Sequence, residues 1–161
     1  MTISEYNTLV DLHADGLYRF MLKKSADQDE AKDLVQETFS KVWVKRENVA
    51  FEKGKSYLFS TAFNTFIDYT RRQAKFGEYD ETKFETKSES NHHSDLKEVI
   101  EEALQRLPDI QKTVLLLRDY EGYDYAEIGK ITDLSESQVK VYIFRARKEM
   151  KKYLVSIDLV I

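Results

Sequence analysis

The amino-acid sequence predicts an all-α protein with two small helical domains joined by a flexible linker. One proline and five glycines in 161 residues are too few for the many turns of a parallel α/β fold or a β-sandwich. Apolar residues recur every three or four positions along most of the chain, which is the spacing of amphipathic helices. An acidic, serine-containing stretch at 76–94 lacks this period, so it is the predicted linker between domains at 1–75 and 95–155.

Three helices are expected in the first domain. Their predicted positions are residues 6–22, residue 27 to the start of a loop at 48–54, and residues 56–75, with a break at 23–27. The apolar side of the second helix predicts that Trp43 points into the domain. The third helix is rich in aromatic residues, of which Phe59, Phe66 and Ile67 are expected in the core.

The second domain is expected to contain four helical segments. Residues 96–107 form an amphipathic helix that ends before Pro108, because the residue before a proline is disfavoured in the helical conformation. Residues 109–120 form the next helix, and Gly122 ends it.

The last two segments have the pattern of a helix-turn-helix. Two capping boxes are predicted at the helix starts, formed by Asp124 with Glu127 and by Ser135 with Gln138. The turn between the helices is predicted at 132–134. Gly129 is expected at the point where two crossing helices come closest.

The longer of these two helices separates apolar residues from basic ones. Its predicted buried stripe consists of Val139, Ile143, Ala146 and Met150. Its opposite side carries Lys140, Val141, Phe144, Arg145, Lys148 and Lys151. Basic side chains around a short readable face suit a helix in the major groove of DNA, so this segment predicts DNA binding. The alternative is an ordinary amphipathic helix with solvated lysines.

The net charge of −4 conceals two basic islands. Residues 51–75 carry +3 and residues 138–161 carry +4, whereas residues 76–95 and 96–137 carry −4 and −5. Because salt screens charges beyond about 8–10 Å, local charge counts for more than distant charge, and each island can bind phosphates. Charge runs of this kind are equally consistent with solvated helix faces.

Other functional classes find no support in the residues. The absence of cysteine excludes disulfides, thiolate metal sites and cysteine nucleophiles. His92 and His93 are adjacent but lack acids or cysteines at ligand spacing, so no metal is expected. No catalytic or cofactor motif is found, so we expect neither enzyme activity nor a cofactor. A cytoplasmic protein without a membrane partner is expected, because there is no secretory signal and no apolar run of about 20 residues.

Four segments occur in order along the chain. They are DLVQETFSKVW, YLFSTAFNTFIDYTRRQ, LPDIQKTVLLLRDYEGYDYAEIGKI and SQVKVYIFRARKEM. In these segments the sequence resembles the extracytoplasmic-function (ECF) group of the sigma-70 family of RNA polymerase sigma factors. The resemblance covers the chain except for the linker and the residues after Tyr153. It implies a transcription initiation factor in which 1–75 is sigma region 2 and 95–155 is the sigma region 4 helix-turn-helix domain.

The resemblance also implies which residues meet the partners, bacterial RNA polymerase core and promoter DNA. Asp33, Gln36 and Glu37 would dock on the clamp helices of the largest polymerase subunit, with the flap of the second subunit as a further contact. The loop at 51–55 and Asn64 would trap a base flipped out of the −10 element. The implied −10 contacts are Lys53, Lys55, Tyr57, Asn64, Arg71 and Arg72. The implied −35 contacts are Ser137, Gln138, Lys140, Val141, Phe144, Arg145 and Lys148. An anti-sigma factor is a common further partner in this family.

Several residues differ from those that are common in the family. Tyr57 replaces a common tryptophan, and Ser60 and Phe63 replace common arginines, which makes the −10 surface less basic than usual. Asp133 replaces a common glycine in the turn, where aspartate tolerates left-handed backbone better than most residues. Val141 replaces a common serine, and its methyl groups would favour contact with a thymine methyl.

Two other functions are weighed against this one. A free-standing helix-turn-helix regulator would share only the second domain and would use the first for sensing or dimerisation. It would bind duplex DNA specifically without polymerase, and its first domain would hold a ligand pocket. A hydrolase or metal enzyme would need a nucleophile elbow, a phosphate loop or a histidine–carboxylate ligand set, and the sequence contains none of them.

Overall fold

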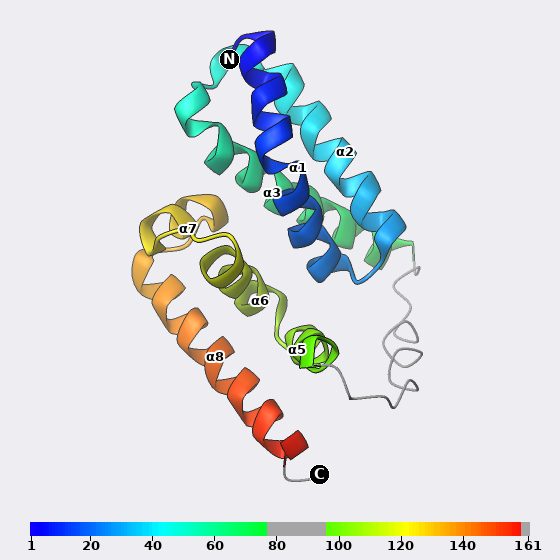
Figure 1. Ribbon diagram of the computed structural model, residues 1–161, viewed down its shortest axis with the longest axis vertical. Helices are drawn as coiled ribbons and strands as arrows, with labels where there is room; N and C mark the ends of the chain where they lie inside the picture. The colour runs from blue at the N-terminus through cyan, green and yellow to red at the C-terminus, as the bar shows by residue number, and fades with distance from the viewer. Residues whose placement is uncertain (77–95, 159–161) are drawn as a thin grey trace.

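The computed structural model describes residues 1–76 and 96–158, and all regular structure in these residues is helical. The first domain comprises α1 (Ile3–Ser25), α2 (Gln28–Lys45) and α3 (Gly54–Lys75), with short 3₁₀ turns at Arg46–Asn48 and Phe51–Lys53. The second comprises α5 (Leu96–Gln105), α6 (Asp109–Leu115), the π-helical turn η3 (Leu116–Tyr120), α7 (Tyr125–Thr132) and α8 (Glu136–Asp158). The prediction of an all-α fold is therefore confirmed (Figure 1). The predicted linker beyond residue 76, which includes His92 and His93, lies outside the described residues.

The first two helices are separated by only two residues, fewer than the predicted break at 23–27. Helix α1 continues through Lys24 to Ser25 and is capped by Ala26, whose φ of 59° is left-handed. Asp27 then starts α2, because its carboxylate accepts hydrogen bonds from the backbone N–H groups of Asp29 and Glu30. The longer α1 places Lys24 on the buried side of the domain.

The core of the first domain is formed by one side of each of its three helices. Leu17 and Phe20 of α1 and Phe59 of α3 are almost completely buried. In α2 the buried positions are Ala31, Leu34, Thr38 and Val42, which recur every three or four residues. Of the three predicted α3 core residues, Phe59 and Phe66 are buried and Ile67 is half-buried.

The prediction that Trp43 points into the domain is wrong. Trp43 follows Val42 by one position, which turns its side chain by about 100° away from the buried row. It is 37% exposed and contacts the ring of Tyr6 edge-on, with 4.9 Å between the centroids. The guanidinium of Arg46 lies 3.7 Å from the centre of the indole ring. The indole therefore forms a surface aromatic cluster.

The helix-turn-helix forms as its capping residues predict. At the start of α7 the Asp124 carboxylate accepts a hydrogen bond from the backbone N–H of Glu127, which is one half of the predicted capping box. Ser135 and Gln138 form a reciprocal capping box before α8, with hydrogen bonds of 2.9 and 3.1 Å. Asp133 takes the left-handed conformation in the turn, with a φ of 59°.

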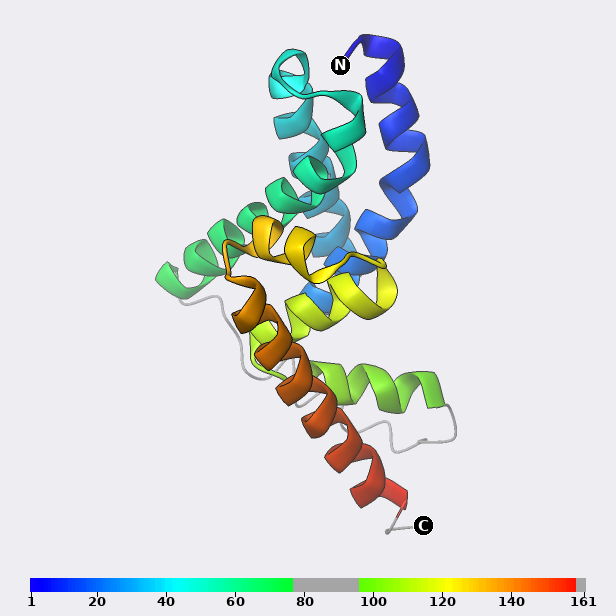
Figure 2. The ribbon, with the colours of Figure 1, turned by 90° about the vertical axis from the view of Figure 1, so that its left-hand side faces the viewer.

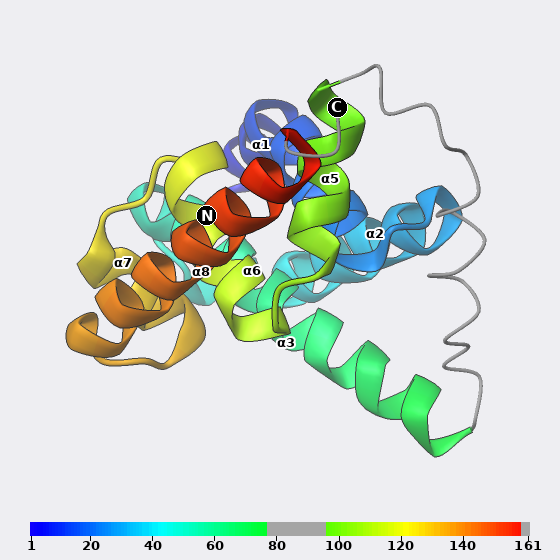
Figure 3. The ribbon, with the colours of Figure 1, turned by 90° about the horizontal axis from the view of Figure 1, so that it is seen from below.

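The two domains pack directly on each other. Their buried side chains belong to one continuous apolar cluster that includes residues of α1, α3, α6, α7 and α8. Helix α7 lies against α3, while the C-terminal half of α3 extends away from the second domain (Figures 2 and 3). No helix in the described part of the chain is long and apolar enough to cross a membrane.

Candidate nucleic-acid interface

Helix α8 presents one continuous solvent-exposed face. Val139, Ile143 and Ala146 are buried against the domain, as the periodicity predicts. All seven residues of the implied −35 set are exposed: Ser137, Gln138, Lys140, Val141, Phe144, Arg145 and Lys148. Val141 and Phe144 are 44% and 68% exposed, so two apolar side chains stand on a basic surface. A helix face of this kind can contact phosphates at its edges and base edges in its middle.

Two residues near the start of α8 also make contacts within the domain. The Lys140 ammonium lies 3.7 Å from a carboxylate oxygen of Glu136 and 5.6 Å from the ring centre of Tyr125. The Oε1 atom of Gln138 accepts the hydrogen bond from the Ser135 N–H that closes the capping box. These contacts restrict both side chains at the start of the exposed face.

A shallow hollow of about 370 Å³ lies between α2 and α3. It is lined by Lys41, Val44, Lys45, Tyr57, Thr61 and Asn64. Tyr57 and Asn64 are residues of the implied −10 set, so the structure brings these two together. Sequence reasoning missed Lys41 and Lys45, which are four residues apart on α2 and therefore lie on one side of it. Their position beside α3 depends on helix packing, and no local signal indicates it.

The other residues of the implied −10 set lie outside this hollow. Lys53 is exposed in the turn before α3, and Arg71 is exposed near the C-terminal end of α3. Lys55 is half-buried and turned toward the second domain, where its ammonium donates a 3.3 Å hydrogen bond to the backbone oxygen of Glu121. The same ammonium lies 4.6 Å from the ring centre of Tyr123.

The polar face of α2 borders on α3. Asp33 and Gln36 are exposed, and Glu37 is half-exposed. The Glu37 carboxylate lies 3.6 Å from the ammonium of Lys41 and 3.6 Å from the guanidinium of Arg72. The implied polymerase-binding face and the implied −10 surface are thus joined by an ion-pair network.

A second, larger groove runs beside α8 in the second domain. It has a volume of about 430 Å³ and an apolar lining that includes Leu104, Leu115, Met150, Leu154 and Val155. At its edge the Arg147 guanidinium donates a 2.6 Å hydrogen bond to the Asp119 carboxylate. This hydrogen bond raises the pKa of Arg147. The groove was not predicted, because its residues come from four separate segments.

Both halves of the chain match known protein families, and most of its length matches curated proteins. The family described as Sigma-70 region 2 matches residues 9–76, and Sigma-70, region 4 matches residues 97–150. The ECF RNA polymerase sigma factor SigM of Bacillus subtilis (strain 168) is 32% identical over 156 residues, with 94% of both chains covered. The RNA polymerase sigma factor SigV of the same organism is 33% identical over 155 residues, covering 94% of this chain and 92% of SigV.

Solved structures share the fold across both domains. The sigma factor RpoE, in complex with the anti-sigma factor NepR from Bartonella quintana, matches with a TM-score of 0.78 and 21% identity. That match covers 94% of this chain and 98% of RpoE. CnrH, in complex with the cytosolic domain of CnrY, matches with a TM-score of 0.72 and 20% identity, covering 94% of this chain and 88% of CnrH. By its sequence relatives, the chain belongs to the ECF group of the sigma-70 family and is an RNA polymerase sigma factor that directs promoter-specific transcription initiation.

Proposed function

We propose that four surfaces divide the work of this sigma factor. The polar face of α2 binds the clamp helices of polymerase, the hollow between α2 and α3 receives an unpaired base of the −10 element, and α8 reads the −35 element. The apolar groove beside α8 is the proposed site for the polymerase flap. The factor acts in the bacterial cytoplasm, where polymerase meets promoter DNA.

The composition of the α2–α3 hollow is the observation that carries this proposal. Tyr57 offers an aromatic ring for stacking, and Asn64 offers an amide for hydrogen bonds to a base edge. Lys41 and Lys45 supply two positive charges for the neighbouring phosphates. Extruding a base costs a few kcal/mol, and stacking together with edge hydrogen bonds is the known way to offset that cost.

Binding of polymerase holoenzyme to a forked −10 DNA tests the hollow. Tyr57→Ala should weaken binding by about 1–3 kcal/mol, the usual value of one base–aromatic stack. Lys45→Gln should weaken binding. It should also reduce the slope of log affinity against log salt concentration by about one, the share of one phosphate contact. Lys32→Gln, which removes an exposed lysine of α2 outside the hollow, is the matched control. If Tyr57→Ala and Lys45→Gln bind as tightly as Lys32→Gln, the hollow does not hold DNA.

For the −35 element we propose that Val141 and Phe144 contact thymine methyl groups. Both are exposed, and three residues apart they share one side of α8. Replacing a contacted thymine by deoxyuridine removes one methyl, which should cost about 0.8 kcal/mol, or roughly fourfold in affinity. Val141→Ser should abolish the difference between thymine and deoxyuridine at one position. Equal affinity of the parent for both bases at every −35 position contradicts this contact.

Charge reversal tests the polymerase-binding face of α2. Asp33→Arg together with Glu37→Arg should abolish binding to polymerase core, because charge complementarity fixes the docking. Since Glu37 also pairs with Arg72, the single variant Asp33→Arg is the cleaner test. Asp11→Arg reverses an exposed carboxylate on α1 and is the matched control. Unchanged affinity of Asp33→Arg for core at matched salt rejects this surface.

We also propose an anti-sigma partner. The structural relatives RpoE and CnrH were solved in complexes with NepR and with the cytosolic domain of CnrY, respectively. Co-purification of the full chain at low salt, followed by competition with polymerase core, tests this proposal. An anti-sigma partner should be displaced by core, and a protein that binds together with core is not one.

A further inference from the structure

Gln138, the third residue of α8, uses one end of its side-chain amide inside the protein. Its Oε1 atom accepts a 2.9 Å hydrogen bond from the backbone N–H of Ser135, and its own backbone N–H donates a 3.1 Å hydrogen bond to the Ser135 hydroxyl. Because the Ser135 N–H is a donor, the end of the amide that faces it has to be the oxygen. The capping box therefore fixes which end of the Gln138 amide points away from the turn.

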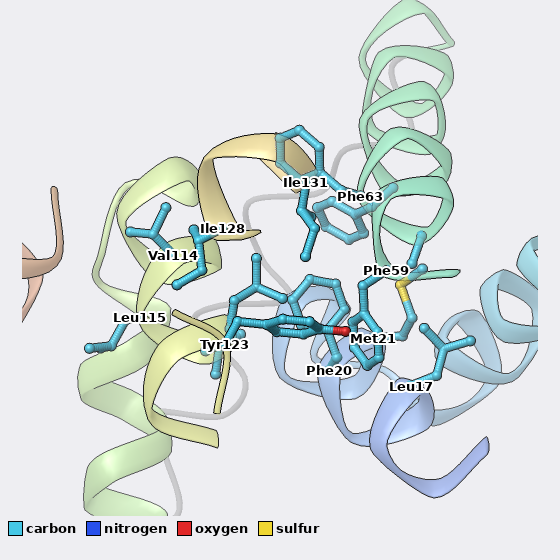
Figure 4. Packing of buried hydrophobic residues seen from close by; sticks show 14 of the residues in the cluster. Leu17, Phe20, Met21, Phe59, Phe63, Val114, Leu115, Tyr123, Ile128 and Ile131 are labelled. Carbon is cyan, nitrogen blue, oxygen red and sulfur yellow. The ribbon is translucent and has the colours of Figure 1, made fainter. Parts of the chain in front are cut away.

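The turn between α7 and α8 holds the Ser135 N–H in place. Leu134, the residue before Ser135, donates a 3.0 Å hydrogen bond from its backbone N–H to the backbone oxygen of Gly129. Ile131 of α7 and Val139 of α8 are buried on the two sides of the turn, and Figure 4 shows Ile131 in the apolar cluster. The oxygen end of the Gln138 amide is thus bound to backbone that the core of the domain anchors.

The outward end of the Gln138 amide is its NH2 group, which only donates hydrogen bonds. Gln138 is exposed, and residues at the start of a recognition helix are the ones that reach base edges in the major groove. A glutamine with both ends free pairs with adenine, because it accepts from N6 and donates to N7. With Oε1 occupied, Gln138 cannot accept from N6. Adenine is therefore a poor match for this side chain.

The nearest carboxylate on α8 does not supply the missing acceptor. Glu136 lies two positions before Gln138, and residues two apart on a helix do not face each other. Its carboxylate oxygen lies 3.7 Å from the Lys140 ammonium, with which it forms an ion pair. The start of the exposed face of α8 therefore offers hydrogen-bond donors at Gln138 and Lys140.

A group that only donates suits a base that presents two neighbouring acceptors. In the major groove guanine presents N7 and O6 side by side, and the two hydrogens of an NH2 group match them. An A·T pair presents adenine N7 and thymine O4, with the N6 donor of adenine between them. A G·C pair is therefore the better partner of the Gln138 NH2 group.

We propose that Gln138 is a specificity-determining residue of the −35 surface and that its capping box with Ser135 restricts it to reading guanine. The proposal rests on the role given to α8 under Proposed function and deepens it by naming a base. Val141 lies three residues further along α8, so the two side chains are neighbours, about 5–6 Å apart. The guanine should therefore lie within about two base pairs of the thymine proposed for Val141, at 3.4 Å per base pair.

Selection by polymerase holoenzyme from promoter duplexes with a randomised −35 element tests the proposal. The parent should enrich a G·C pair at one position. Gln138→Glu should lower the ratio of affinities for G·C and A·T at that position by about tenfold, within the usual range for one bidentate base contact. The ratio is compared because an added negative charge weakens binding to all sequences.

Gln138→Glu separates base reading from capping. A carboxylate oxygen also accepts from the Ser135 N–H, so the capping box is kept, but the outward oxygen of glutamate cannot donate. The midpoint of thermal unfolding should therefore stay at the parent value while the preference for guanine is lost. In the parent, 7-deazaguanine at the selected position removes the N7 acceptor and should weaken binding several-fold, whereas Gln138→Glu should not distinguish it from guanine.

Releasing the amide should change the base that it reads. Ser135→Pro removes the N–H that holds Oε1, because proline has none, and the released amide should pair with adenine. The ratio of affinities for A·T and G·C should then rise by about tenfold. Ser135→Ala is the matched control, because it loses the hydroxyl but keeps the N–H, and its preference for guanine should equal that of the parent. The 7-deazaguanine measurement needs no variant at Ser135, so it decides the question if Ser135→Pro does not fold.

The outcomes separate the reading of guanine from the wider role of α8. The proposal is overturned if the position that responds to Gln138→Glu prefers A·T in the parent, or if the guanine preference survives in Ser135→Pro. It is also overturned if Gln138→Glu selects the same −35 element as the parent, which would leave Gln138 a capping residue only. In each case the reading role of α8 stands if Arg145→Ala changes the selected element. If neither Gln138→Glu nor Arg145→Ala changes it, the function proposed for α8 fails as well.

Discussion

Two glycines of the second domain are needed for different physical reasons. Gly122 has a φ of +75°, a left-handed conformation that side chains disfavour, although a Cβ there would meet no atom within 4 Å. Gly129 is helical, but a Cβ on it would lie 2.7 Å from the backbone oxygen of Leu134. The sequence predicts a close approach at Gly129, and the structure shows that the turn after α7, rather than a crossing helix, makes it.

Alanine at these positions should therefore destabilise through different mechanisms. Gly129→Ala should lower the free energy of unfolding by about 1–3 kcal/mol, because a backbone oxygen cannot yield to the added methyl group. Gly122→Ala should cost about 1–2 kcal/mol of backbone strain without steric overlap. Denaturant unfolding of the full chain measures both values. A Gly129→Ala chain as stable as the parent would show that the α7–α8 turn moves easily.

At the scale of elements, the sequence predicts local features well. The capping residues Asp124 and Ser135, the turn at Asp133 and the buried stripe of α8 all depend on neighbours within four residues. Trp43 and the break between α1 and α2 were predicted less well. Lys24 is buried although it was predicted in the break, and Trp43 is 37% exposed although it was predicted in the core.

The turn of the helix-turn-helix provides an element-scale prediction. Asp133→Gly should stabilise the chain by up to about 1 kcal/mol, because glycine adopts the left-handed φ of 59° without steric cost. Ser135→Ala should destabilise it by about 1 kcal/mol, because the capping box before α8 loses its hydroxyl acceptor. Thermal unfolding of both variants under identical conditions checks the signs. If both variants shift the midpoint of thermal unfolding in the same direction, the cap and the turn do not contribute independently to stability.

At the scale of the whole molecule, the packing of the two domains on each other should depend on pH, because it buries Lys24 of α1 against α6. We call this packing the closed state and an arrangement with the domains apart the open state. The charged groups that act on Lys24 are Asp109, which favours its protonated form, and Lys112, which opposes it. In the closed state the pKa of Lys24 is about 8, whereas an exposed lysine titrates near 10.4. Between these values the closed state has released a proton that the open state still binds. Closure should therefore become more favourable as the pH rises through this window, by up to about 1.4 kcal/mol per pH unit.

A pair of distance labels on Asp11→Cys of α1 and Lys152→Cys of α8 measures this effect directly, because the chain has no other cysteine. The closed population should increase between about pH 8 and pH 10, and it should change little between pH 6 and pH 7.5, where both states hold the proton. The Lys24→Met chain should show a smaller pH dependence. A closed population that falls as the pH rises from 8 would reverse the sign and contradict the burial of a charged Lys24.

Association with promoter duplex is a second property of the whole molecule. The free chain should bind duplex DNA weakly, because its basic islands carry only +3 and +4 and few phosphate contacts give little affinity at physiological salt. Holoenzyme should bind the same duplex far more tightly, since polymerase holds both domains at the spacing of the promoter elements. A salt-controlled titration of both forms measures the difference. Nanomolar, sequence-specific binding by the free chain would instead favour a free-standing regulator.

The sequence by itself determined the helices, their caps and the exposed face of α8, because each depends on periodicity and hydrogen bonds within a few residues. Only the tertiary structure decided the burial and contacts of residues whose partners are far away in the chain. The sequence predicts that Lys24 belongs to a polar break between helices, yet its side chain is buried among Phe63, Phe66 and Asp109. The family resemblance implies that Lys55 contacts DNA, yet its ammonium donates a hydrogen bond to the backbone oxygen of Glu121, 66 positions away in the sequence. Whether a charged side chain is solvated or buried depends on which surface folds over it, and no local pattern encodes that.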